Sequence, residues 1–232
     1  MRFLTLALFV LLASVAPVMA HPHILISAIV RFIEKDGQFT HVEIEWRFDP
    51  MASSIEIVAA DADRDGKLSS KEVKAMGDVA LQELKGFGYL TWFATGEKDF
   101  RPPKAPTFNA HIADPAVFVP EDWAPTADPP GGPMAKPGAP PKPDAKVETK
   151  AKRFRNLVYV FRYPLANPTK TLSVASVDPE DFIRIEADRK APYEIVGKAE
   201  GAKCNVDKHP TVKSEYWPGN PFFADRVTCT LP

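Results

Sequence analysis

A short acidic segment in the first third of the chain has the residue types and spacing of a cation-binding loop. In the 232-residue sequence, aspartates stand at the first, third and fifth positions of the stretch from Asp61 to Glu72. Gly66, at the sixth position, allows a sharp turn of the backbone. Calcium loops of helix-loop-helix motifs take their oxygen ligands from the first, third, fifth, seventh, ninth and twelfth positions. The predicted Ca²⁺ ligands are Asp61, Asp63, Asp65, the backbone carbonyl of Lys67, Ser69 and Glu72.

The residues on both sides of this loop predict the two helices that it needs. Pro50 suits the first turn of a helix. Apolar residues then recur at helical spacing before and after the loop: Met51, Ile55 and Val58, then Val73, Met76, Ala80 and Leu84. The pattern over residues 50–86 is typical of an EF-hand, and Glu72 favours Ca²⁺ over Mg²⁺ because it can supply two oxygens. The alternative is a solvated acidic turn, and structural and sensing roles both stay open.

The first 20 residues have the pattern of a cleavable signal peptide. Arg2 precedes an apolar run from Leu4 to Ala16, and Val18 and Ala20 suit a cleavage site. A helix needs about 20 apolar residues to cross a bilayer, and this run is shorter. No second apolar run as long as this one follows. We therefore expect an exported protein, cut after Ala20, that is not an integral membrane protein.

Histidines at the predicted mature N-terminus form a second candidate metal site. Cleavage would leave the amine and ring of His21 two residues before His23, and such groups bind Cu²⁺, Ni²⁺ or Zn²⁺. Pro22 has no N–H, which excludes the square-planar mode that needs a backbone amide there. A histidine brace with a distant histidine stays open, as does a polar terminus without metal, and His41 is a candidate additional ligand. We expect His111 and His209 at the surface.

Strand patterns dominate the rest of the sequence. Residues 24–33 and 39–48 predict an antiparallel hairpin around an Asp-Gly turn. Further strands are predicted at residues 157–161, 171–177, 182–186, 193–196 and 227–229. Residues 102–152 are rich in proline and predict a flexible insertion. The expected fold class is α+β, mostly β: one antiparallel β-sandwich-like domain over residues 21–232, with the helix-loop-helix and the Pro-rich loop inserted.

The two cysteines fit the expected export. Cys204 and Cys229 are the only cysteines of the chain, and a lone pair in an oxidising compartment is typical of one disulfide. The rival interpretation, a redox or metal-binding thiol pair, lacks the C-x-x-C spacing. The formal charge of -1 gives no support for nucleic-acid binding. No catalytic motif occurs, so we expect a protein that is not an enzyme.

Several segments together resemble a known family. They are the start at residues 21–23, the hairpin end at residues 46–50, the loop at residues 61–72, the stretch at residues 177–182 and the cysteine pair. In this order they resemble a bacterial periplasmic family of unknown function, often labelled the periplasmic component of an uncharacterised ABC-type transport system. The Pro-rich stretch departs from that family as an enlarged insertion. The resemblance implies a periplasmic location and an association with divalent-metal transport, and it implies no established activity.

Three hypotheses about function follow. The first is a non-enzymatic periplasmic accessory of divalent-metal transport, with Ca²⁺ in the loop, a transition metal at the N-terminal histidines and an inner-membrane metal-transport permease as partner. The second is a calcium-stabilised structural or interaction domain with no transport role. The third is a copper enzyme with an N-terminal histidine brace. The chain is too short, and has too little β-α alternation, for a two-lobed solute-binding protein.

Overall fold

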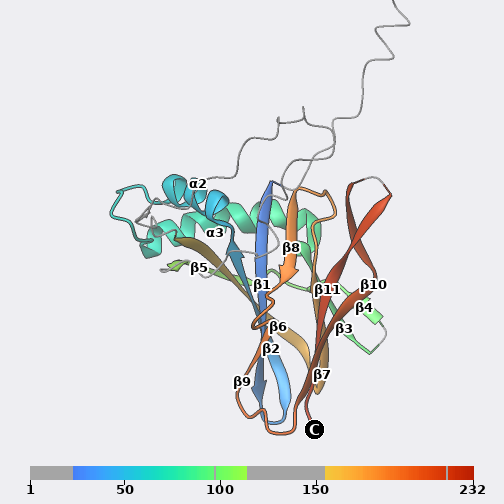
Figure 1. Ribbon diagram of the computed structural model, residues 1–232. Coiled ribbons are helices and arrows are strands. Elements are labelled where there is room, and N and C mark those ends of the chain that lie inside the picture. Colours follow the sequence, from blue (N-terminus) through green and yellow to red (C-terminus); the bar gives the residue numbers. More distant parts are fainter. Residues whose placement is uncertain (1–22, 97, 114–154, 218) are drawn as a thin grey trace, which may run out of the picture.

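The computed structural model describes residues 23–96, 98–113, 155–217 and 219–232. Over these ranges the chain forms two β-sheets, two α-helices and a 3-10 helix, which confirms the predicted α+β, mostly β class (Figure 1). None of the described helices is long and apolar enough to cross a membrane. The predicted signal peptide, His21 and residues 114–152 of the predicted insertion lie outside the described residues.

The larger sheet is built on the predicted hairpin. Its strands, in order across the sheet, are β5 (Thr107–Ala113), β6 (Asn156–Thr169), β2 (Gln38–Phe48), β1 (Ile24–Lys35) and β8 (Ile183–Ala187), with β9 (Tyr193–Val196) also paired to β1. Asp36 and Gly37 both have positive φ, which suits the tight turn between β1 and β2. The neighbours are antiparallel, except that β8 and β9 run parallel to β1.

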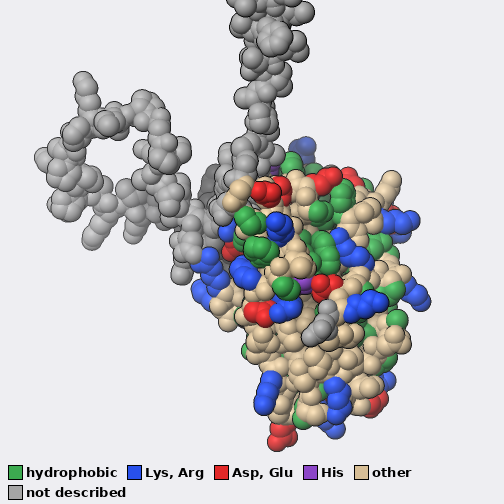
Figure 2. Space-filling view, turned by 90° about the vertical axis from the view of Figure 1, so that its right-hand side faces the viewer, with side chains coloured by type: hydrophobic (Ala, Val, Ile, Leu, Met, Phe, Trp, Pro, Cys, Tyr) green, Lys and Arg blue, Asp and Glu red, His purple; other side chains and the backbone are tan. Residues whose placement is uncertain are grey.

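The smaller sheet packs against one part of the larger sheet. Its strand order is β10 (Lys203–Trp217), β11 (Asn220–Thr230), β7 (Thr171–Ser176), β3 (Thr91–Thr95) and β4 (Lys98–Phe100). Phe32, Phe39 and Leu172 are fully buried in the shared core, and the rings of Phe32 and Phe39 are 5.2 Å apart. The face seen in Figure 2 mixes cationic and anionic side chains rather than showing one sign.

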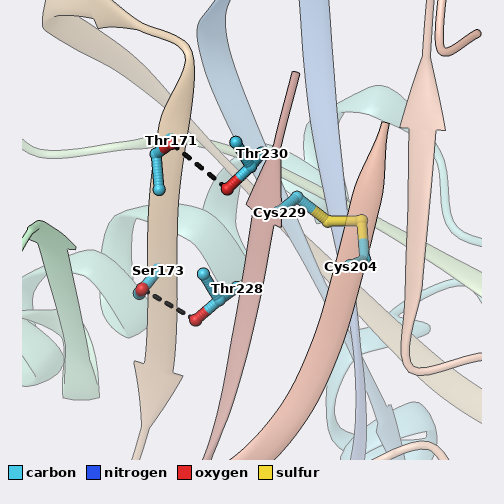
Figure 3. Close-up of a disulfide and its surroundings, with 6 residues drawn as sticks. All are labelled: Thr171, Ser173, Cys204, Thr228, Cys229 and Thr230. Atoms are coloured by element: carbon cyan, nitrogen blue, oxygen red, sulfur yellow. Dashed lines mark hydrogen bonds between the residues drawn. A yellow bond between two sulfur atoms is a disulfide. The ribbon is translucent and has the colours of Figure 1, made fainter. Parts of the chain in front are cut away.

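A disulfide joins the last two strands of the smaller sheet, as predicted. Cys204 and Cys229 stand directly opposite each other on β10 and β11 and are bonded. Figure 3 shows two hydroxyl pairs beside it that join β7 to β11, Ser173 with Thr228 and Thr171 with Thr230. The bond therefore ties the C-terminal strands together at the edge of the sandwich.

Helices cover the other part of the larger sheet. They are α2 (Pro50–Ala60) and α3 (Ser70–Leu84), followed by the 3-10 helix η1 (Lys85–Leu90). Asp49 fixes the start of α2, because its Oδ1 accepts hydrogen bonds from the N–H groups of Met51 and Ala52 while its Oδ2 accepts from Leu25 of β1. The Ser53 hydroxyl joins α2 to the larger sheet: it donates to the Phe48 carbonyl and accepts from the backbone N–H of Leu157.

The buried face of α2 differs from the predicted one. Met51, Ile55 and Val58 are 65%, 64% and 79% exposed, whereas Ala52, Ser53 and Ile57 are buried. Small residues and the bonded Ser53 hydroxyl allow α2 to lie close to the sheet, and this close approach turns the larger apolar side chains outward. The helix was predicted correctly, but its orientation was not.

Other differences concern the strands. Within the segment predicted to be flexible, Thr107–Ala113 forms β5, because Phe108 packs against Tyr159 and Phe161 and the whole strand pairs with β6. Strands β3, β4 and β10 were not predicted. In β10 the apolar-polar alternation is interrupted by a register shift between Lys208 and Lys213, and Pro210 lies in that interval.

Candidate metal centre

The predicted calcium loop lies between the two helices. It leaves α2 after Ala60 and enters α3 at Ser70. Leu68 packs against the hydrophobic core, while Asp63 and Asp65 are exposed. This arrangement anchors the loop by its apolar residue and leaves the carboxylates of Asp63 and Asp65 at the surface.

The three aspartates converge. Asp61, Asp63 and Asp65 each offer one carboxylate oxygen, and these oxygens lie within 4.8 Å of one another. Within the part of the chain that the structure describes, no Lys or Arg forms an ion pair with any of them. Like charges this close repel one another, and a divalent cation would remove that repulsion. The observed donor set consists of hard oxygens, which suits Ca²⁺.

The backbone of the loop wraps around these carboxylates. Asp61 is buried, and its two oxygens accept hydrogen bonds from the N–H groups of Asp65, at 3.0 Å, and Gly66, at 2.8 Å. Asp65 in turn accepts from the N–H of Lys67 at 2.8 Å. Gly66 has a φ of +80°, a conformation that a side chain would strain. These bonds hold the side chains at the first and fifth positions inside the turn.

An arginine that is distant in the sequence supports the loop. Arg155, just before β6, donates from Nη1 to the carbonyl oxygen of Gly66 at 2.7 Å. The sequence separation is 89 residues, so this contact depends on the tertiary fold. His111 of β5 is exposed, as predicted, and lines the same hollow beside the loop as Arg155. The loop is therefore supported by the sheet as well as by its own helices.

Glu72 and Ser69 have a different arrangement from the aspartates. The Glu72 carboxylate accepts from the Ser69 N–H at 2.8 Å, from the Ser69 hydroxyl at 2.7 Å and from the Ala62 N–H at 2.7 Å. This is a capping box at the start of α3. The hydrogen bonds from Ser69 and Ala62 hold the pKa of Glu72 below its usual value. Glu72 is thus ionised and adjacent to the loop, but it lies outside the group of three converging carboxylates.

The structure does not bring His23 and His41 together. The His23 backbone N–H donates to the Phe182 carbonyl, and the two rings are 5.1 Å apart. His41 pairs with Ile33, which is ten residues from His23 along β1, so at 3.3 Å per residue the two histidines are about 33 Å apart. Partial burial, and then the charge of Arg162, lower the pKa of His41. The prediction of His41 as an additional ligand beside His23 is therefore wrong.

The prediction of a surface position for His209 is also wrong. Only 2% of its surface is exposed, and it lies within the register shift of β10 between Lys208 and Lys213. Its Nε2 is 3.1 Å from Asp99 Oδ1, and its Nδ1 accepts from the N–H groups of Thr211 and Val212. These bonds assign the ring proton to Nε2 and give His209 a structural role. Pro210, next to His209, marks the strand irregularity and not a surface position.

Comparison with known proteins identifies a family. The sequence profile of a family described as "Protein of unknown function (DUF1007)" matches residues 6–217, which is nearly the whole chain. No curated protein and no solved structure matches the chain. Since the match covers the helix-loop-helix and both sheets as far as β10, it includes the acidic loop. The chain belongs to this family of unknown function.

Proposed function

We propose that this protein is an exported calcium-binding protein whose single EF-hand-like loop holds one Ca²⁺. The ligands would be the side chains of the three converging aspartates, the Lys67 carbonyl, Ser69 directly or through a water, and Glu72. The convergence of the three carboxylates within 4.8 Å, without a counter-cation among the described residues, is the observation that carries the proposal. An EF-hand-like loop between two helices is a frequent setting for such ligands.

The role proposed for calcium is structural support of the helix pair. Bound Ca²⁺ would supply positive charge among the aspartates and link the end of α2 to the start of α3. Glu72 and Ser69 already hold each other at that start, so their participation would connect the capping box to the ion. A non-enzymatic role fits the absence of any catalytic motif in the sequence.

The proposal also includes a periplasmic location and a partner in the inner membrane. The disulfide and the signal-peptide pattern support export to the periplasm. The family resemblance supports a role as an accessory of divalent-metal transport, acting with an inner-membrane metal-transport permease. In that role, His21 and the exposed His23 would bind Zn²⁺, Ni²⁺ or Cu²⁺ at the mature N-terminus. A calcium-stabilised domain without a transport role is the alternative.

Calorimetric titration of the mature protein, residues 21–232, tests the calcium site. We expect one Ca²⁺ per chain, with an affinity between about micromolar and millimolar, and weaker binding of Mg²⁺. Asp65→Asn should abolish the binding. Asp78→Asn is the matched control, because Asp78 is an exposed carboxylate of α3 that pairs with Lys74 outside the loop. Unchanged Ca²⁺ binding in Asp65→Asn would overturn the proposed site.

Metal analysis tests the transport role separately. We expect the mature protein to take up one equivalent of Zn²⁺, Ni²⁺ or Cu²⁺, and His23→Ala to lose it while keeping Ca²⁺. Uptake of Ca²⁺ alone would remove metal delivery and the copper-enzyme hypothesis together, and would leave the calcium-stabilised domain.

A further inference from the structure

The helices do not seal the sheet beneath them. A groove with a volume of about 650 Å³ runs between α2 and α3. We call it the α2–α3 groove. Trp46, Phe48 and Tyr159, from the inner face of the larger sheet, line it. This volume lies within the range of pockets that bury small organic ligands, about 300 to 1,000 Å³.

Small side chains keep the groove open. Ala59 of α2 and Ala75 and Ala80 of α3 are among the helix residues that line it. At the β5 edge, by contrast, α3 touches the sheet closely: a Cβ on Gly77 would lie 2.7 Å from Phe108 Cδ1. Val79 also lines the groove and is more than half exposed. One edge of α3 is thus fixed to the sheet, while alanines leave a space above the aromatic side chains.

Four carboxylates line the groove: Asp63 and Glu72 belong to the loop, and Glu56 and Glu83 lie on the two helices. Glu56 of α2 and Glu83 of α3 both line the groove with Tyr159. Burial raises the pKa of the Tyr159 hydroxyl, and the charges of both glutamates raise it further. No ion pair of Glu56 or Glu83 with a described cation is present. Lys71, at the loop end, is the basic residue among those that line the groove.

The aromatic side chains also include an unmet polar group. The Trp46 indole Nε1 is buried, and no described residue accepts a hydrogen bond from it. Buried polar groups without a partner are rare in folded proteins. The groove therefore combines an aromatic and apolar lining with helix carboxylates, Glu56 and Glu83, that form no ion pair with a described cation.

We propose that the α2–α3 groove binds a small amphiphilic organic cation. Its apolar body would lie against Trp46, Phe48 and the alanines of both helices. Its positive group would lie between Glu56 and Glu83, beside the Tyr159 hydroxyl. Carboxylates attract such a group, and aromatic side chains stabilise it further when they present their faces. The inference adds an organic ligand to the protein and rests on Glu56 and Glu83, which are not among the proposed Ca²⁺ ligands. Asp63, Ser69 and Glu72 of the proposed Ca²⁺ site also line the groove, so the test is made at fixed Ca²⁺.

A series of ligands with one chain and three head groups tests the proposal. Mature protein is titrated calorimetrically, at fixed Ca²⁺ and below micelle-forming concentrations, with decyltrimethylammonium, decanol and decyl sulfate. We expect saturable binding of one decyltrimethylammonium per chain, about 10-fold tighter than decanol, and the weakest binding for decyl sulfate. Equal affinity for all three would show that the carboxylates do not select the ligand, and would overturn the proposal.

Variants locate the binding. In Glu56→Gln/Glu83→Gln, the preference for the cation over decanol should disappear while decanol binding is unchanged. Glu180→Gln/Glu200→Gln is the matched control, because both residues are exposed and neither lines the groove. Ala75→Leu, at an exposed position of α3, should fill the groove and weaken binding of every ligand. A cation preference that survives in Glu56→Gln/Glu83→Gln would contradict the assigned site.

One further titration separates a small ligand from a partner protein. An amphipathic helical peptide of leucine and lysine presents the same chemistry on a macromolecule. Binding of decyltrimethylammonium at the groove supports the proposal. Binding of the peptide that depends on Glu56 and Glu83, without binding of decyltrimethylammonium, would overturn the proposal and assign the groove to a partner segment.

Discussion

The larger sheet has two different covers. Along one part the smaller sheet closes over it, with fully buried aromatic residues such as Phe32 and Phe39 and a disulfide at the edge. Along the other part the two helices cover it incompletely. There Ile55 and Val58 point to solvent, and a groove of about 650 Å³ remains above the sheet.

This contrast separates stability from binding. In the closed part, Phe32, Phe39 and Leu172 are fully buried between the two sheets. The helix part has uncompensated carboxylates in the loop and in the α2–α3 groove, together with exposed apolar side chains, and such features cost free energy unless something binds there. We infer that the sandwich is the stable scaffold, and that the helix pair, which covers the sheet incompletely, provides the binding sites.

The largest effect is expected from the core of the sandwich. Phe32→Ala should lower the free energy of unfolding by about 3–5 kcal/mol, because it removes a fully buried ring. Denaturant unfolding measures this loss. Phe182→Ala is the matched control, since Phe182 is half exposed and the substitution should cost far less. Equal losses in both variants would contradict the assignment of stability to the closed part.

The disulfide should contribute slightly less. Replacing both Cys204 and Cys229 by Ala is expected to cost about 3 kcal/mol, because the bond closes a loop of 25 residues in the unfolded chain. Thermal unfolding checks the loss, and Ca²⁺ affinity should be unchanged. A fall in Ca²⁺ affinity would show that the two parts are coupled.

Acid should weaken the scaffold through Glu45. This residue is 6% exposed and is bonded to Arg31 and Arg47, each at 2.6 Å. Burial alone would raise its pKa, but the two guanidinium groups outweigh burial and hold the pKa below its usual value. The stability that Glu45 contributes is therefore complete above its unfolded pKa, which is about 4.3, and is lost as the pH falls through the lower folded value.

Glu45→Gln measures that contribution. We expect a loss of about 2 kcal/mol at neutral pH, the scale for hydrogen bonds to charged groups, and a weaker fall in stability below about pH 4. Glu43→Gln is the control, since Glu43 pairs with the more exposed Arg162. An acid-unfolding curve of Glu45→Gln that keeps the full wild-type slope would exclude Glu45 as the group responsible.

The smallest effect concerns the helix cover. Ser69→Ala removes the N-cap of α3 and should cost about 1 kcal/mol. It should also weaken Ca²⁺ binding, whereas Ser70→Ala, one residue further along, should do neither. Thermal unfolding with and without Ca²⁺ distinguishes the two variants, and indistinguishable behaviour would argue against the capping box as a link to the ion.

Local sequence patterns predicted the elements whose structure depends on residues that are close together in the chain. The alternation in residues 39–48, the Asp-Gly turn and the Asp49-Pro50 start of α2 each depend on neighbours in the chain, and the structure has them there. The loop aspartates converge for the same reason, because their spacing and the turn at Gly66 are local. The lone cysteine pair likewise left one pairing to predict.

Local patterns could not predict the features that depend on tertiary contacts. Ile55 has the spacing of a buried residue, but α2 turns it outward because Ser53 bonds to the sheet. His209 is buried by a strand irregularity, and His41 is separated from His23 by the length of a hairpin. The α2–α3 groove brings together residues from both helices and the sheet, and no short segment of sequence contains its pattern.

Hydrogen exchange followed by mass spectrometry tests whether Ca²⁺ supports the helix pair without affecting the sandwich. The mature protein is compared without and with saturating Ca²⁺. We expect slower exchange in residues 49–84, which contain both helices and the loop, and no change in strands β7 and β11 of the closed sandwich. Slower exchange spread evenly over both parts, or no change in residues 49–84, would contradict a calcium-supported helix cover on an independent scaffold.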